Sequence, residues 1–216
     1  MSRSSRVTFV CVGGFVLLEL VAMRLYPGGT FWDRTTRGAR FWRNFLCDLE
    51  SPVALDGAPN AVGSRFGQAA MAILAAGLAP FWWSAPRLFV ELRALGTAVR
   101  ALGLASLGGV AAVISMPSSR FGALHGIAVI AAGVPGLTAA LLAVVGLASA
   151  EPSPRVAALL GGATLAISAV DFALYVQTMR AAGPGPTLLP VAQKVALLLL
   201  LAWMLTVAWR TGRRRR

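Results

Sequence analysis

Charged residues are scarce in this chain, and the shortage identifies the solvent in which it folds. Only 13% of the 216 residues are Asp, Glu, Lys or Arg, and 57% are hydrophobic. Soluble domains carry about 25% charged residues, whereas the mean hydropathy here is +0.71. These values exclude an ordinary soluble domain and predict an all-α, polytopic membrane protein.

Histidine and cysteine are nearly absent, which removes most metal-site chemistry. The single histidine, His125, cannot build a zinc site of several histidines. The two cysteines, Cys11 and Cys47, form no CxxC motif. The spans described below also place them too far apart for a disulfide, whose Cα atoms lie roughly 4.4–6.8 Å apart. We expect neither a metal site nor a bound cofactor.

The chain contains several long apolar runs. A helix of about 20 apolar residues crosses a hydrocarbon core about 30 Å thick, and six runs have this length. They lie near Val7–Leu25, Phe66–Trp83, Thr97–Met116, Ala123–Leu147, Val156–Val176 and Leu188–Trp209. Because every connection except the first is short, residues 1–216 are expected to form one six-helix domain without a separate soluble domain.

The arginines are divided unequally between the two ends of these spans. With the N-terminus inside, the inner segments hold eleven arginines and the outer loops hold seven. The run Arg213–Arg216 directly follows the last span, and such basic clusters favour the anionic cytoplasmic leaflet. We therefore expect both termini in the cytoplasm, with the first span retained because no small-residue cleavage site follows it.

The net charge of +12 has the same membrane explanation. A nucleic-acid partner would require basic residues on a soluble face, and the chain has no such segment. We expect membrane lipids as partners and no nucleic acid.

The segment between the first two spans, residues 26–64, is the only long connection. Aromatic residues and leucines recur in it at helical spacing, while another face holds Arg40, Asn44, Cys47 and Asp48. This pattern predicts an amphipathic helix in the membrane interface, followed by a turn from Pro52 to Asn60. We expect the loop to cover the bundle as an extracytoplasmic lid; the alternative is a belt helix that only anchors the protein.

The same loop contains the string Asn44-Phe45-Leu46-Cys47-Asp48-Leu49, followed by Gly57-Ala58-Pro59-Asn60. This string resembles a signature of small six-span bacterial membrane proteins, grouped loosely with the DRAM/Sfk-type membrane family. The resemblance implies a six-helix protein of the bacterial plasma (inner) membrane. It makes Asn44, Cys47, Asp48 and Asn60 the positions of interest, although the family supplies no role for them.

Nearly every ionisable residue within the apolar runs lies toward the end opposite the C-terminus, namely Glu19, Arg24, His125, Asp171 and Lys194. Charge inside a bilayer is costly and is usually retained for a role. We expect a buried Asp171–Lys194 ion pair, with Glu19 contacting Arg24 or Lys194. This pair would either anchor the headgroup of a ligand or only fix the packing of the helices.

The one-sided cluster predicts a polar pocket near the outer face that binds a lipid headgroup or a small amphiphile. The candidate ligand-binding residues are Asn44, Asp48, Asn60, His125, Asp171, Tyr175 and Lys194. Small residues on the helix faces, such as Gly103, Gly108, Gly161 and Gly162, favour close packing and would also allow homo-oligomers.

The alternative is a membrane-embedded enzyme that acts on a lipid or isoprenoid. Its candidate catalytic residues are Cys47, Asp48 and His125. Arg40 or Arg43 would lower the pKa of the Cys47 thiol, and a carboxylate from Asp48 or Asp171 would orient His125 as a general base. A transporter is less favoured, because the inner halves of the spans lack a continuous polar stripe.

Overall fold

Six long helices form the structure, a computed structural model that describes residues 2–181 and 186–213. They are α1 (Arg3–Leu25), α3 (Ala61–Ser84), α4 (Arg93–Ser115), α6 (Ala123–Ser149), α7 (Arg155–Ala181) and α8 (Leu189–Arg213). Each is long and apolar enough to cross a membrane, which confirms the predicted all-α, polytopic architecture. Most extend beyond the predicted spans, because hydropathy marks the apolar middle of a helix and not its polar first and last turns.

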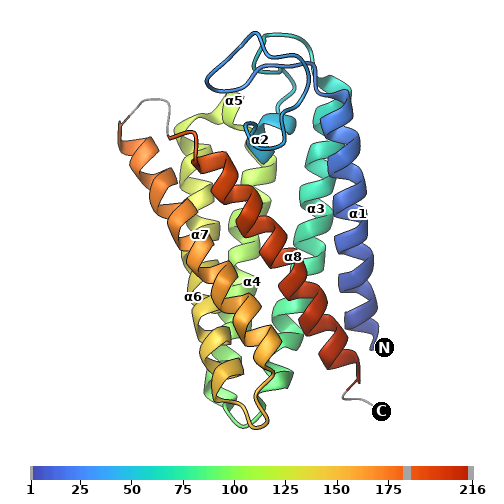
Figure 1. The fold of residues 1–216 in the computed structure, drawn as a ribbon, viewed down its shortest axis with the longest axis vertical. Helices are drawn as coiled ribbons and strands as arrows, with labels where there is room; N and C mark the ends of the chain where they lie inside the picture. The colour runs from blue at the N-terminus through green and yellow to red at the C-terminus, as the bar shows by residue number, and fades with distance from the viewer. Residues whose placement is uncertain (1, 182–185, 214–216) are drawn as a thin grey trace.

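Consecutive long helices pack against each other in pairs (Figure 1). α1 packs on α3, α4 on α6 and α7 on α8, as short connections between antiparallel helices favour. A 3-10 helix, η1 (Ala85–Leu88), joins α3 to α4, and a single turn, α5 (Ser118–Phe121), joins α4 to α6. Because α8 also contacts α1 and α3, it connects the first helix pair to the last.

The core contains an aromatic cluster of Phe81, Trp82 and Trp203, whose ring centroids lie 4.7–6.1 Å apart. Trp203 is completely buried. Its indole lies against α7 at Gly161, where a Cβ atom would come within 2.8 Å of the ring. Trp82 packs against Gly103 of α4 in the same way. These two glycines therefore have the packing role that the sequence predicts.

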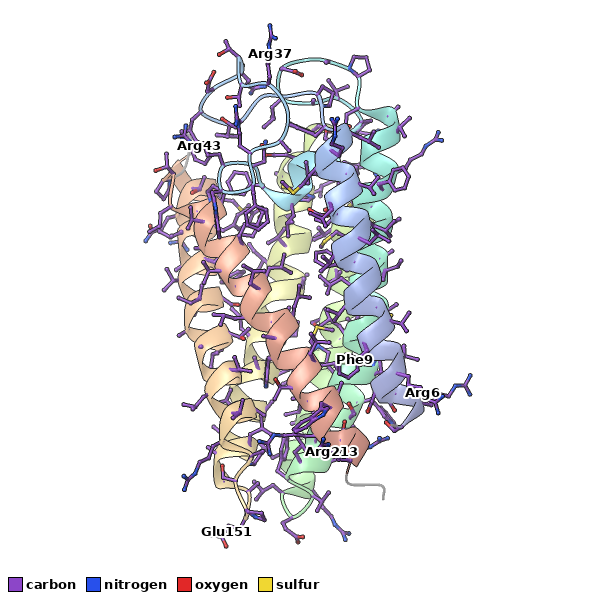
Figure 2. All side chains as sticks on the ribbon, turned by 45° about the vertical axis from the view of Figure 1, so that its right-hand side comes forward. Arg6, Phe9, Arg37, Arg43, Glu151 and Arg213 are labelled. Atoms are coloured by element: carbon purple, nitrogen blue, oxygen red, sulfur yellow. The ribbon has the colours of Figure 1, made fainter. Side chains whose placement is uncertain are left out.

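The two ends of the bundle are covered differently. Figure 2 shows Arg6, Glu151 and Arg213 at the end where α1 begins and α8 ends, and Arg37 and Arg43 at the opposite end. The first loop folds over that opposite end (Figure 1). This arrangement matches the predicted threading, with the loop as a cover; Arg214–Arg216 of the basic run lie outside the described residues.

The predicted amphipathic helix of this loop is only one turn long, α2 (Leu46–Leu49). Residues 41–43 form a turn instead. The side chains of Asn44 and Asp48 accept hydrogen bonds from nearby backbone N–H groups, and such local bonds compete with helix formation. Three of the four residues of α2 are buried, so α2 packs into the end of the bundle.

Candidate functional site

Asn44 holds the first loop in shape. Its amide Nδ2 donates to the Gly29 carbonyl at 2.8 Å and to Asp48 Oδ2 at 3.1 Å, while its Oδ1 accepts from the Arg40 N–H at 2.8 Å. The residue is only 2% exposed. Because its donors and its acceptor are all used within the loop, Asn44 forms the framework of the site and does not face a ligand.

Asn60 attaches the loop to the beginning of α3. Its Nδ2 donates to the carbonyls of Leu49 and Ser51, at 3.3 and 2.9 Å. Gly67, further along α3, allows this approach, because a Cβ atom there would lie 3.0 Å from the Leu49 carbonyl oxygen. Like Asn44, Asn60 supports the loop and lines none of the cavities described below.

Lys194 of α8 is buried and also binds the loop. Its Nζ donates to the Asn44 carbonyl at 2.7 Å and to Gln193 Oε1 at 3.2 Å. The same Gln193 oxygen accepts from the Leu46 N–H, at 3.0 Å. Two adjacent side chains of α8 therefore hold the beginning of α2.

The predicted Asp171–Lys194 ion pair is wrong. Both residues are described, yet Lys194 forms its hydrogen bonds with a backbone carbonyl and an amide, and Asp171 acts on it only as a nearby charge. Sequence reasoning pairs opposite charges, and it cannot anticipate that the folded loop brings a carbonyl oxygen closer to the ammonium than any carboxylate.

Glu19 of α1 is buried beside this group. Its Oε1 has no hydrogen-bond partner among the described residues, and its charge acts on Lys194 and on Glu50. Arg24, the other predicted partner of Glu19, is exposed. The predicted contact of Glu19 with Lys194 is therefore an electrostatic interaction between nearby charges and not an ion pair.

A polar cavity of about 270 Å³ lies between α2, α6, α7 and the loop. Its lining brings together four of the predicted site residues, namely Asp48, His125, Asp171 and Tyr175. Cys47, Glu50 and Gln193 complete its polar lining together with Ser118 and Thr178. Among the described lining residues there is no lysine or arginine, so the charged groups that face this cavity are mainly carboxylates.

His125 presents a hydrogen-bond acceptor to the cavity. Its Nδ1 lies 2.7 Å from the Met116 carbonyl oxygen, and because a carbonyl only accepts, Nδ1 must carry the proton. In the neutral ring Nε2 is then an acceptor, and no described residue bonds to it. The predicted orienting carboxylate is therefore replaced by a backbone carbonyl.

Glu50 is the lining residue that the sequence analysis missed. It directly follows α2, is 3% exposed, and its carboxylate has no hydrogen-bond partner among the described residues. Burial, and next the neighbouring Glu19, raise its pKa to about 8. Sequence reasoning ordinarily predicts that an acid in a polar loop is exposed to solvent. The feature that could have indicated its burial is its position immediately after the apolar residues of Leu46–Leu49.

Asp48 shares this environment but is better satisfied. Its Oδ2 accepts from the Phe45 N–H at 2.8 Å and from Asn44 Nδ2. Burial raises its pKa to about 6, and these hydrogen bonds, which favour the charged form, limit the increase. Asp48 therefore loses its proton more readily than Glu50.

Cys47 does not have the properties predicted for a nucleophile. Burial, followed by the nearby Asp48 and Glu50, raises the pKa of its thiol far above the ordinary value. Arg40 and Arg43, the predicted activators, are exposed, so the prediction that they lower this pKa is wrong. At neutral pH the side chain is a thiol, and the thiolate is the form that acts as a nucleophile.

An apolar cavity of about 330 Å³ continues from the polar one toward the middle of the bundle. The two cavities share five lining residues, Met71, Val113, Val129, Asp171 and Phe172. Trp82 and Trp203 lie at its deeper end, and its other lining residues are mostly aliphatic. Along α7 the lining of the two cavities extends from Thr164 to Thr178, which is about 21 Å of helix.

A third hollow, of about 960 Å³, lies within the loop on the other side of the polar cavity. It shares Phe31, Asp48 and Ser118 with that cavity, and Arg34 and Arg120 line its outer part. From the loop inward there is thus a hollow lined by both arginine and aspartate, then a cavity with acidic residues, and then an apolar cavity.

The chain matches no protein-family model, and no curated protein or solved structure resembles it at a significant level. The resemblance of its first loop to the DRAM/Sfk-type family therefore stays a prediction.

Proposed function

We propose that this membrane protein binds an amphiphile, with the polar head in the acidic cavity under the loop and the apolar chain in the adjoining apolar cavity. The observation that carries the proposal is that the two cavities share five lining residues, and that the ionisable side chains that line them are concentrated in the cavity under the loop. Taken together, their volumes of about 270 and 330 Å³ suit a small-molecule ligand, whose pockets measure about 300–1,000 Å³.

The elongated shape supports a chain as the occupant. The two cavities together extend about 21 Å along α7, which is most of a hydrocarbon core about 30 Å thick. A chain there would lie nearly parallel to the membrane-spanning helices, as lipid chains do, and would contact Trp82 and Trp203 at its end. Membrane lipids of the bacterial plasma membrane are the proposed source, with the loop in the extracytoplasmic half and both termini in the cytoplasm.

Native mass spectrometry of the purified protein tests this proposal. Ser168 of α7 lines the apolar cavity, and Ser168→Leu would fill the space that the chain needs. Ala169, its neighbour, is exposed on the outside of the bundle, so Ala169→Leu adds a leucine without entering the cavity. We expect co-purifying amphiphile on the original protein and on Ala169→Leu, and its loss from Ser168→Leu. Equal retention by the two variants would show that the bound lipid lies elsewhere.

A further inference from the structure

The cavity under the loop is lined by three ionisable residues whose acceptor atoms have no partner in the described part of the chain, together with the hydroxyl groups of Ser118 and Tyr175, which can donate or accept. His125 Nε2, the carboxylate of Glu50 and the carboxylate of Asp171 all lack a partner among the described residues, and all three residues line this cavity. His125 is 5% exposed and Glu50 3%, whereas Asp171 is partly exposed. Buried acceptors of this kind are costly unless a donor reaches them.

The charge of the lining has one sign. Asp48, Glu50 and Asp171 contribute carboxylates. The nearby cation, Lys194, does not line the cavity, and its ammonium is engaged by the Asn44 carbonyl and Gln193. A phosphate or carboxylate head would therefore meet acidic residues and no basic residue among the described lining, whereas a cationic head would stabilise the ionised forms of two otherwise unpaired acids.

The acceptors are also spread around the cavity. Among the described residues, no three His, Cys, Asp or Glu side chains are grouped as the ligands of one metal ion. A head with several N–H bonds can reach acceptors on different walls, and a protonated primary amine has three. The raised pKa of Glu50 agrees with this picture, because without a cation this carboxyl group resists ionisation.

We infer that the polar cavity receives a protonated amine, carried either by the headgroup of a membrane lipid or by a single-chain amphiphile. Glu50 and Asp171 would bind the ammonium, and His125 Nε2 would accept one of its hydrogen bonds. This inference rests on the proposed function and adds to it the chemical class of the headgroup.

Three amphiphiles with the same chain and different heads provide the test, namely tetradecylamine, tetradecanol and tetradecanoic acid. Titration of the purified protein with each, followed by native mass spectrometry, gives their relative dissociation constants. We expect tetradecylamine to bind about tenfold or more tightly than the other two, since a charge-assisted hydrogen bond contributes roughly that factor. Glu50→Gln and Asp171→Asn should each reduce this preference severalfold. Asp33→Asn, which changes an exposed loop acid outside these cavities, should preserve it.

Two lipids with the same chains identify the source of the amine. Dimyristoylphosphatidylethanolamine carries a primary amine, whereas dimyristoylphosphatidylglycerol does not. Displacement of tetradecylamine by the former and not the latter would support a lipid headgroup, and displacement by neither would support a single-chain amine.

The outcomes separate this inference from the proposed function. If the three single-chain amphiphiles bind with equal affinity and Ser168→Leu blocks them all, the protein binds amphiphiles but the amine inference is overturned. The amine inference is equally overturned if the preference for tetradecylamine is unchanged when Glu50→Gln and Asp171→Asn are combined. If none of the three binds, the proposed function itself fails.

Discussion

At the scale of single residues, the site separates into side chains that build it and side chains that face it. Asn44, Asn60 and Lys194 donate their side-chain N–H groups to partners within the protein. Glu50, His125 and Asp171 retain free acceptors at the cavity wall. This division has physical consequences, because a framework residue and a lining residue should respond differently to substitution.

The buried acid Glu50 should make the stability of the protein depend on pH. Its pKa is raised to about 8 in the folded state, against roughly 4.3 for an unperturbed Glu. The folded protein therefore binds a proton that the unfolded chain has released, and stability falls as pH rises from about 5 to about 8. Glu50→Gln removes this loss, on the order of 3 kcal/mol.

The measurement is the Tm of both proteins at pH 5 and pH 8. We expect Glu50→Gln to melt close to the original protein at pH 5 and at a clearly higher temperature at pH 8. Asp33→Asn, an exposed acid, is the control. A difference between the two proteins that does not grow with pH would contradict the burial of a neutral Glu50.

The framework role of Asn44 leads to a different expectation. Asn44→Ala leaves the Arg40 N–H without its partner and the Gly29 carbonyl with only the longer bond, 3.5 Å, from Tyr26 Oη; an unsatisfied buried group costs roughly 1–3 kcal/mol. We expect a Tm several degrees lower at every pH between 5 and 8. Arg37→Ala, in an exposed part of the same loop, should have little effect, and a similar Tm for the two variants would contradict the framework role.

At the scale of elements, the first loop packs on α3 through one glycine and two side-chain amides. Gly67 faces the Leu49 carbonyl, and Asn60 and Gln68 donate to loop carbonyls from the same region. The cover of the polar cavity therefore depends on close approach between the loop and one helix.

Gly67→Leu should detach the loop, because its side chain would occupy the place of the Leu49 backbone. We expect trypsin to cleave this variant faster at Arg37, Arg40 and Arg43 than it cleaves the original protein. Gly108→Leu in α4 is the matched control, since a Cβ atom at Gly108 meets no atom within 4 Å. Equal cleavage of the two variants would show that this contact does not hold the loop.

The elements also show what the sequence can and cannot predict. The six spans follow from hydropathy, because lipid requires long apolar helices with all backbone groups bonded internally. The shortness of α2 does not follow, since the spacing of Phe41 to Leu49 is helical and only the folded loop directs Asn44 and Asp48 to the backbone.

The candidate site was predicted only in part, because part of it also depends on how the loop folds. Threading alone brought Asp48, His125, Asp171 and Tyr175 to one end of the bundle, and they line one cavity. The partner of Lys194 was predicted wrongly and Glu50 was missed. Both depend on the path of the loop backbone, which residue types do not encode locally.

At the scale of the whole molecule, the bundle has one end covered by the loop and one end where α1 begins and α8 ends (Figure 2). The arginine distribution favours the second end as cytoplasmic. In a variant without Cys11 and Cys47, a new cysteine at Arg37 should react with a membrane-impermeant maleimide on intact spheroplasts. One at Arg6 should react only after permeabilisation. The reverse pattern would invert the proposed orientation and place the polar cavity on the cytoplasmic side.

The central claim is that an apolar chain occupies the cavity beside Trp82 and Trp203, and tryptophan quenching tests it directly. In a protein that retains only these two tryptophans, the others being replaced by phenylalanine, octadecyl amphiphiles brominated near the chain end would be added in lipid nanodiscs. The account predicts saturable quenching that Ser168→Leu abolishes and Ala169→Leu preserves. Quenching that rises without saturation and is equal in both variants would mean that the bromines reach the indoles only from the surrounding bilayer, which would contradict the account.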